Sequence, residues 1–98
     1  MATVEEAINA HINYCEKQKH PTHSAVFNRG MDIWIRVLES APRDLTEVQK
    51  LLDGRNRKLN EAQTYEQQEP IWDEIQALGW VLMILRGSDK ERKARTLW

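Results

Sequence analysis

The chain has 98 residues, of which 41% are hydrophobic and 30% charged, and its formal net charge is −1. These values fit one small globular domain, and the nearly neutral charge gives no overall field that would attract nucleic acid or a membrane surface. The only cysteine is Cys15, which excludes an intrachain disulfide, and residues 1–10 lack the basic segment of a signal peptide. The longest apolar run, 77–85, is far shorter than the roughly twenty residues that span a bilayer, so we expect a soluble cytoplasmic protein with no membrane partner.

The first predicted helix begins at residue 4 and ends at Lys19 or His20. Thr3 and Glu6 form a capping box, in which the threonine side chain satisfies a free backbone N–H at the helix start. Apolar side chains then recur every three or four residues and draw one stripe along the helix. Pro21 ends the segment because proline disfavours helical geometry in the residue before it.

The second predicted helix follows a short link at residues 20–23, with Thr22 or Ser24 as its N-cap. Gly30 lies inside the apolar stripe, where glycine costs about 1 kcal/mol relative to alanine, and close approach of another helix would compensate for that cost. Asp32 and Arg36 are four residues apart and are expected to form an ion pair on the outer side of the helix.

Two further helices complete the predicted elements. Asp44 opens the third, and Gly54 either ends it early or lies within one long helix, which is the interpretation we favour. Pro70 suits the first turn of the fourth helix, and Arg86 followed by Gly87 is a typical stop signal. Because no residue from 77 to 85 is polar, this helix should be covered on all sides.

The predicted fold class is therefore all-α. We expect a small four-helix bundle, antiparallel or orthogonal, in which the apolar C-terminal helix is central. Residues 1–87 form the domain, and residues 88–98 form a basic tail that is either disordered or an extension of the last helix. No β-alternation is long enough to predict a strand.

One group of residues has metal-ligand chemistry. A helix would place the imidazole and thiol of positions 11 and 15 on the same face, and two more histidines follow in the next link. The weak candidates for a zinc site are His11, Cys15, His20 and His23. Their spacing differs from familiar zinc motifs, so the favoured interpretation places the first two in the core and the others in an exposed turn. We expect no metal and no cofactor.

The sequence offers little that is typical of an enzyme. A thiol nucleophile needs exposure and a nearby base, whereas Cys15 lies on the apolar stripe of the first helix. Glu66, Glu69, Asp73 and Glu74 are interpreted as the solvated start of the fourth helix. We therefore expect a non-catalytic protein with no small-molecule substrate.

Two basic clusters favour an alternative role in binding nucleic acid. Clustered lysine and arginine side chains neutralise phosphates, although acidic residues are interleaved with them here. The residues of the two clusters are Arg55, Arg57 and Lys58, and Arg92, Lys93 and Arg95. The favoured interpretation of both clusters is a solvated helix face.

The tryptophans point to a protein partner. Trp34 and Trp72 lie on apolar stripes and are expected in the core, whereas the last helix has more apolar surface than a small bundle can bury. Tryptophan is enriched at binding hot spots. The predicted partner-binding residues are Trp80, Met83, Ile84 and Trp98. The partner is another protein or a further copy of this chain.

In size, helical composition and lack of motifs, the chain resembles the small accessory proteins of phages and mobile elements. Many proteins of that kind inhibit host enzymes or defence complexes, and the resemblance implies a comparable role as an inhibitor or modulator of a host protein complex. The resemblance is one of type, and no residue carries it, so it transfers no functional residues to this chain.

Overall fold

A computed structural model describes the backbone of residues 3–96 and the side chains of residues 3–87. The described backbone contains helices and no strand, which confirms the all-α prediction. The elements in chain order are α1 (Val4–Gln18), α2 (Ala25–Ser40), α3 (Leu45–Glu61) and α4 (Tyr65–Thr96). The backbone of residues 88–96 extends α4, one of the two predicted outcomes for the tail, and the side chains there lie outside the described part.

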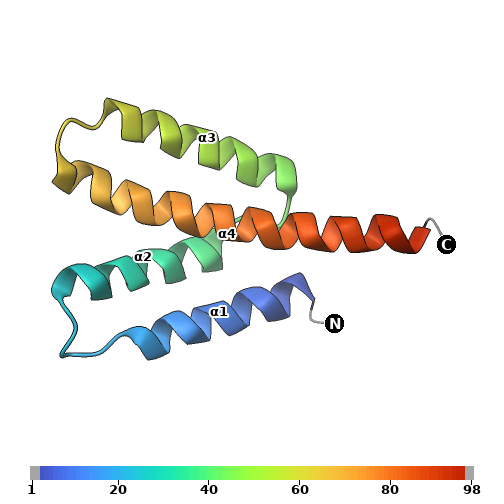
Figure 1. The fold of residues 1–98 in the computed structure, drawn as a ribbon, viewed down its shortest axis with the longest axis horizontal. Coiled ribbons are helices and arrows are strands. Elements are labelled where there is room, and N and C mark those ends of the chain that lie inside the picture. The colour runs from blue at the N-terminus through green and yellow to red at the C-terminus, as the bar shows by residue number, and fades with distance from the viewer. Residues whose placement is uncertain (1–2, 97–98) are drawn as a thin grey trace.

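The four helices form two antiparallel hairpins, α1 with α2 and α3 with α4 (Figure 1). The hairpins meet where α4 packs against α2 and, less extensively, against α1. Among the described helices, α3 packs its backbone closely only against α4. The helix α4 is therefore central, as its composition predicted. The Cα atoms span 50 × 32 × 16 Å, so the molecule is a flat slab.

The helix starts follow the predicted capping chemistry. Each N-cap side chain accepts a hydrogen bond from the backbone N–H three residues further on, at 3.0–3.1 Å. These caps are Thr3 for α1, Ser24 rather than Thr22 for α2, and Asp44 for α3. Such a cap stabilises a helix by about 1 kcal/mol. Gly54 lies within α3, so the helix that runs through this glycine, which we favoured, is confirmed, and it ends at Glu61.

The predicted ends of α4 were wrong. The helix begins at Tyr65, because Thr64 Oγ1 accepts a hydrogen bond of 3.2 Å from the Gln67 backbone N–H. Pro70 consequently lies inside the helix and not in its first turn. Gly87 does not stop the helix, because it does not adopt the left-handed conformation of a glycine C-cap.

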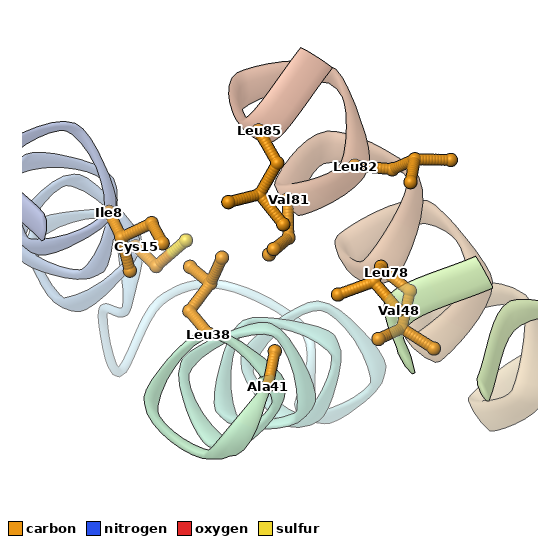
Figure 2. Packing of buried hydrophobic residues seen from close by; sticks show 9 residues of the cluster. All are labelled: Ile8, Cys15, Leu38, Ala41, Val48, Leu78, Val81, Leu82 and Leu85. Atoms are coloured by element: carbon orange, nitrogen blue, oxygen red, sulfur yellow. The ribbon is translucent and has the colours of Figure 1, made fainter. Parts of the chain in front are cut away.

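The core is shared by all four helices, and α4 supplies the largest part of it (Figure 2). The clustered buried residues are Ile8, Cys15, Leu38, Ala41, Val48, Leu78, Val81, Leu82 and Leu85. Burying a Val, Leu or Ile side chain fully stabilises the fold by about 1.5–3 kcal/mol. No helix in the described part of the chain is both long enough and apolar enough to cross a membrane.

Contacts between helices replace some of the local contacts expected from sequence. A Cβ built on Gly30 would lie 3.2 Å from Asp73 Oδ2, so α2 and α4 do approach closely at this glycine. The predicted ion pair between Asp32 and Arg36 does not form. Asp32 instead pairs with Lys19 at 2.6 Å, and Arg36 reaches across to α4. An exposed i,i+4 pair stabilises a helix by only a few tenths of a kcal/mol, so partners on other helices can replace it.

Candidate functional site

The two sides of α4 have opposite environments. Its inner face lies against the other three helices and is buried, with Ala77 and Val81 completely inaccessible. Its outer face is here defined by residues three, four or seven positions apart, which lie on one side of a helix. The outer face consists of Tyr65, Glu69, Trp72, Gln76, Gly79, Met83 and Gly87.

Large apolar side chains stand exposed on this outer face. Trp72 is 48% exposed, Met83 58% and Tyr65 74%. A Cβ built on Gly79 would meet no atom within 4 Å, so the helix backbone is open to approach at that point. From Trp72 to Met83 the outer face carries no charged side chain. The outer face therefore combines exposed aromatic and thioether side chains with an uncovered stretch of helix backbone.

An aromatic cluster centred on His11 forms one border of the outer face. The His11 ring stacks on Trp80 with centroids 4.3 Å apart, and it lies 5.3 Å from Trp34 and 5.5 Å from Tyr14. Trp80 is half-buried, whereas Tyr14 is 55% exposed. Partial burial lowers the pKa of His11, because desolvation disfavours the charged imidazolium. The cluster fixes Trp80 against α1.

The predicted partner-binding residues have different surroundings in the structure. Met83 is exposed on the outer face, whereas Trp80 and Ile84 are half-buried beside it. Trp98 lies outside the described residues. The role of these residues in binding a partner stays a prediction.

Trp72 was predicted for the core, and that prediction was wrong. The buried face of α4 centres on Ala77, Leu78 and Val81, and Trp72 lies on the opposite side. Because residues 77–85 have no polar side, the sequence does not show how this helix is rotated about its axis. Trp72 belongs instead to the exposed outer face. Trp34, the other tryptophan predicted for the core, is half-buried and packs against it.

The four metal-ligand candidates are not brought together. His11 lies in the aromatic cluster, and Cys15 is buried in the core, where desolvation raises the pKa of its thiol. His20 Nδ1 lies 2.7 Å from Thr22 Oγ1 in the turn, and its ring centroid is 6.1 Å from that of His23. Within residues 3–87 no three His, Cys, Asp or Glu side chains converge on a position that could hold a metal ion. A buried thiol with a raised pKa also gives no support to a nucleophilic role.

The basic cluster on α3 is partly neutralised. Arg55 Nε lies 2.5 Å from Glu74 Oε2, and Arg36 Nη2 lies 3.0 Å from the other oxygen of the same carboxylate. This triad borders a groove of about 130 Å³ between α2, α3 and α4. Arg57 and Lys58 are exposed. The side chains of Arg92, Lys93 and Arg95 lie outside the described residues, and the role in binding nucleic acid stays a prediction.

The acidic residues near the start of α4 do not form one cluster. Glu74 is held by two arginines, while the Asp73 side chain points toward Gly30 of α2. Partial burial, together with repulsion from Glu69, raises the pKa of Asp73. Glu66 is exposed. Of the four carboxylates, only those of Glu69 and Asp73 are thus shown to influence each other, and Glu74 has different partners.

Comparison with known proteins adds no functional assignment. The chain matches no protein-family model, no curated protein and no solved structure. Among the features described for residues 3–87, the outer face of α4 departs most from an ordinary solvated helix face.

Proposed function

We propose that the protein is a non-catalytic protein-interaction module that binds through the outer face of α4. The observation that carries this proposal is the exposure of Trp72 and Met83 on the same helix that supplies the largest share of the core. Covering these side chains would remove apolar surface from water, which is the main driving force of association. Tryptophan is also among the residues that most often dominate binding energy.

The rigidity of α4 supports this proposal. Directly behind the outer face, Leu78, Val81 and Leu82 are at most 6% exposed and are packed against the other helices. A surface held by such a core does not have to become ordered when it binds. Association therefore loses less conformational entropy than it would with a flexible segment.

The open backbone at Gly79 also supports the proposal. No atom lies within 4 Å of the position that a Cβ would take there, so a partner can approach the helix axis closely. The side chains of Trp72 and Met83 project from the same face of the helix, one before and one after Gly79. A partner side chain inserted between them would be flanked by two large apolar side chains, which favours a specific contact.

A binding surface of this kind fits the role that the resemblance to phage and mobile-element accessory proteins implies. Such a protein acts by occupying the surface of another protein, and it needs no catalytic residues. The role as an inhibitor or modulator of a host protein complex is thus a more specific version of the same proposal. Its support is the exposed apolar face of α4.

The test is affinity capture from the native host with matched variants. Met83→Glu places a charge on the outer face, whereas Val26→Glu places the same charge on a 48% exposed residue in the first turn of α2. We expect Val26→Glu to retain the partners of the unmodified chain and Met83→Glu to lose them. Circular dichroism and thermal unfolding would show that both variants are folded. The same set of partners from both variants would contradict the proposal.

A further inference from the structure

We propose that the occupant of the outer face of α4 is a second copy of this chain, with the two α4 helices packed antiparallel about a two-fold axis. This inference rests on the proposed function, because it names the partner of the same surface. A two-fold contact uses one surface patch on both copies, so that patch must be complementary to itself. The order of side chains on the outer face meets this condition.

The self-complementarity follows from one register of the two helices. When the axis passes between residues 77 and 78, Trp72 of one copy lies opposite Met83 of the second copy. The same register places Gln76 opposite Gly79, where the absent side chain leaves room for the glutamine. Symmetry repeats both pairs. A thioether beside an aromatic ring is a favourable contact.

A parallel arrangement of the two helices is less complementary. It would place Gly79 opposite Gly79, leaving a gap in the centre of the contact, and would oppose Trp72 to Trp72 and Met83 to Met83. Unfilled space between helices forfeits dispersion contacts. The antiparallel register instead pairs a large side chain with a small one at the centre, so it favours close packing.

The charges around the outer face also permit two copies to meet. Between Trp72 and Met83 the nearest acidic side chains are Asp73 and Glu74, and neither points out from this face. Asp73 points toward Gly30 of α2, and Glu74 is held on the inner side by two arginines. Two identical surfaces therefore approach each other without like-charge repulsion at their centre.

The length of the face sets the expected strength of the dimer. From Trp72 to Met83 the helix rises by about 16 Å, and Tyr65 extends the face at one end. A stable interface usually buries about 800 Å² on each partner, which is more than a single helix face of this length supplies. We therefore expect a weak dimer with a dissociation constant in the micromolar range.

Sedimentation equilibrium of the full chain, from low micromolar to millimolar concentration, tests the association. We expect a reversible monomer–dimer equilibrium for the unmodified chain and for Val26→Glu. Met83→Glu should raise the dissociation constant about tenfold or more. A chain that stays monomeric over the whole range would overturn the second-copy proposal, and so would a dimer that Met83→Glu leaves unchanged.

Spin labelling tests the antiparallel direction. Arg86→Cys offers an exposed position, and the native Cys15 is only 1% exposed, so the unmodified chain serves as the labelling control. In the antiparallel dimer the two labelled positions lie about 25 Å apart along the helices. In a parallel dimer they would be separated by little more than the interaxial distance of about 8–10 Å. A distance in the shorter range would overturn the antiparallel arrangement.

Failure of this inference is distinguishable from failure of the proposed function. A monomeric chain whose captured partners still depend on Met83 would overturn the second copy as the occupant while leaving the interaction module in place. A chain that neither associates nor loses partners in Met83→Glu would overturn both. In each case Val26→Glu controls for the added charge.

Discussion

The inner and outer faces of α4 both carry large apolar side chains but have opposite surroundings. Val81 and Leu78 are at most 4% exposed, whereas Met83, only two residues from Val81, is 58% exposed. All three belong to the same uninterrupted apolar stretch. The difference shows that an apolar sequence favours burial of a helix, but that the number of helices packed around it limits how much of its surface is buried.

The flat arrangement of the molecule explains the difference. The described helices form a slab whose Cα atoms are 16 Å deep in the thinnest direction, and α4 lies in the middle of that slab, with α3 along one flank and α2 and α1 along the other (Figure 1). Enclosing a helix fully takes packed elements on every side of it. Short chains cannot supply them, so apolar surface stays exposed unless another molecule covers it.

The largest expected effect contrasts the two faces directly. Val81→Asp would bury an unpaired charge in the core, and we expect a loss of about 3–5 kcal/mol in the free energy of unfolding, enough to unfold a small domain. Met83→Asp on the outer face should change it by less than about 1 kcal/mol. Urea denaturation followed by circular dichroism measures both. Equal losses would show that the two faces are equally buried.

A second prediction concerns the polar end of the inner face. Glu74 is only 18% exposed and binds both Arg36 and Arg55, so Glu74→Gln leaves two guanidinium groups without their shared carboxylate. We expect a loss of about 1 kcal/mol in the free energy of unfolding, which shrinks at high salt. Glu47→Gln is the control, because its pair with Lys50 is exposed and 3.5 Å long. The control should lose only a few tenths of a kcal/mol.

A third prediction compares Gly79, on the outer face of α4, with Gly30, where α2 packs closely against α4. Gly79→Ala should stabilise the monomer by about 0.5–1 kcal/mol, because alanine favours the helix and its Cβ meets no atom within 4 Å. Gly30→Ala should gain less, because its Cβ would lie 3.2 Å from the Asp73 carboxylate. Chemical denaturation at low protein concentration measures the two changes. A loss of stability in Gly79→Ala would mean that the outer face is covered within the monomer.

The smallest expected effect arises where the two faces meet. Burial lowers the pKa of His11 below its ordinary value of 6.5, so the folded chain binds fewer protons there than the unfolded chain. The contribution of His11 to stability is therefore present above pH 6.5 and is lost as the pH falls through the lower folded pKa. His11→Phe should remove this pH-dependent contribution to stability. The measurement is the change in unfolding free energy between pH 7 and pH 5, compared between the variant and the unmodified chain. An unchanged pH profile would mean that the imidazole is not desolvated.

Much of the fold could be predicted from local patterns. Thr3 and Asp44 cap helices as expected, because an N-cap needs only a short polar side chain beside free backbone N–H groups. The close approach at Gly30 was also predictable, since glycine in an apolar stripe is otherwise unfavourable. The start of α4 was missed although its signal was present, because Thr64 and Gln67 have capping spacing that Pro70 obscured.

The candidate site was predicted only in part. Met83 was identified because residues 77–85 have more apolar surface than a small bundle can bury. Trp72 was missed because the rotation of α4 about its axis depends on how α1, α2 and α3 pack, and no polar residue in the apolar stretch indicates it. The ion-pair partners of Asp32 and Arg36 were missed for a related reason. These partners are distant in the sequence, and only the packing of the helices brings them close.

The attachment of α3 has a consequence for native-state dynamics. Among the described helices it packs closely only on α4, and Val48 is its one fully buried side chain, so detaching it breaks fewer contacts than unfolding the whole domain. Backbone amides of α3 should therefore exchange with deuterium through a partial opening, ahead of those in α2 and α4. That opening would expose Leu78 and Leu82 to solvent. The briefly populated, partly open form would then have a second exposed apolar surface on α4.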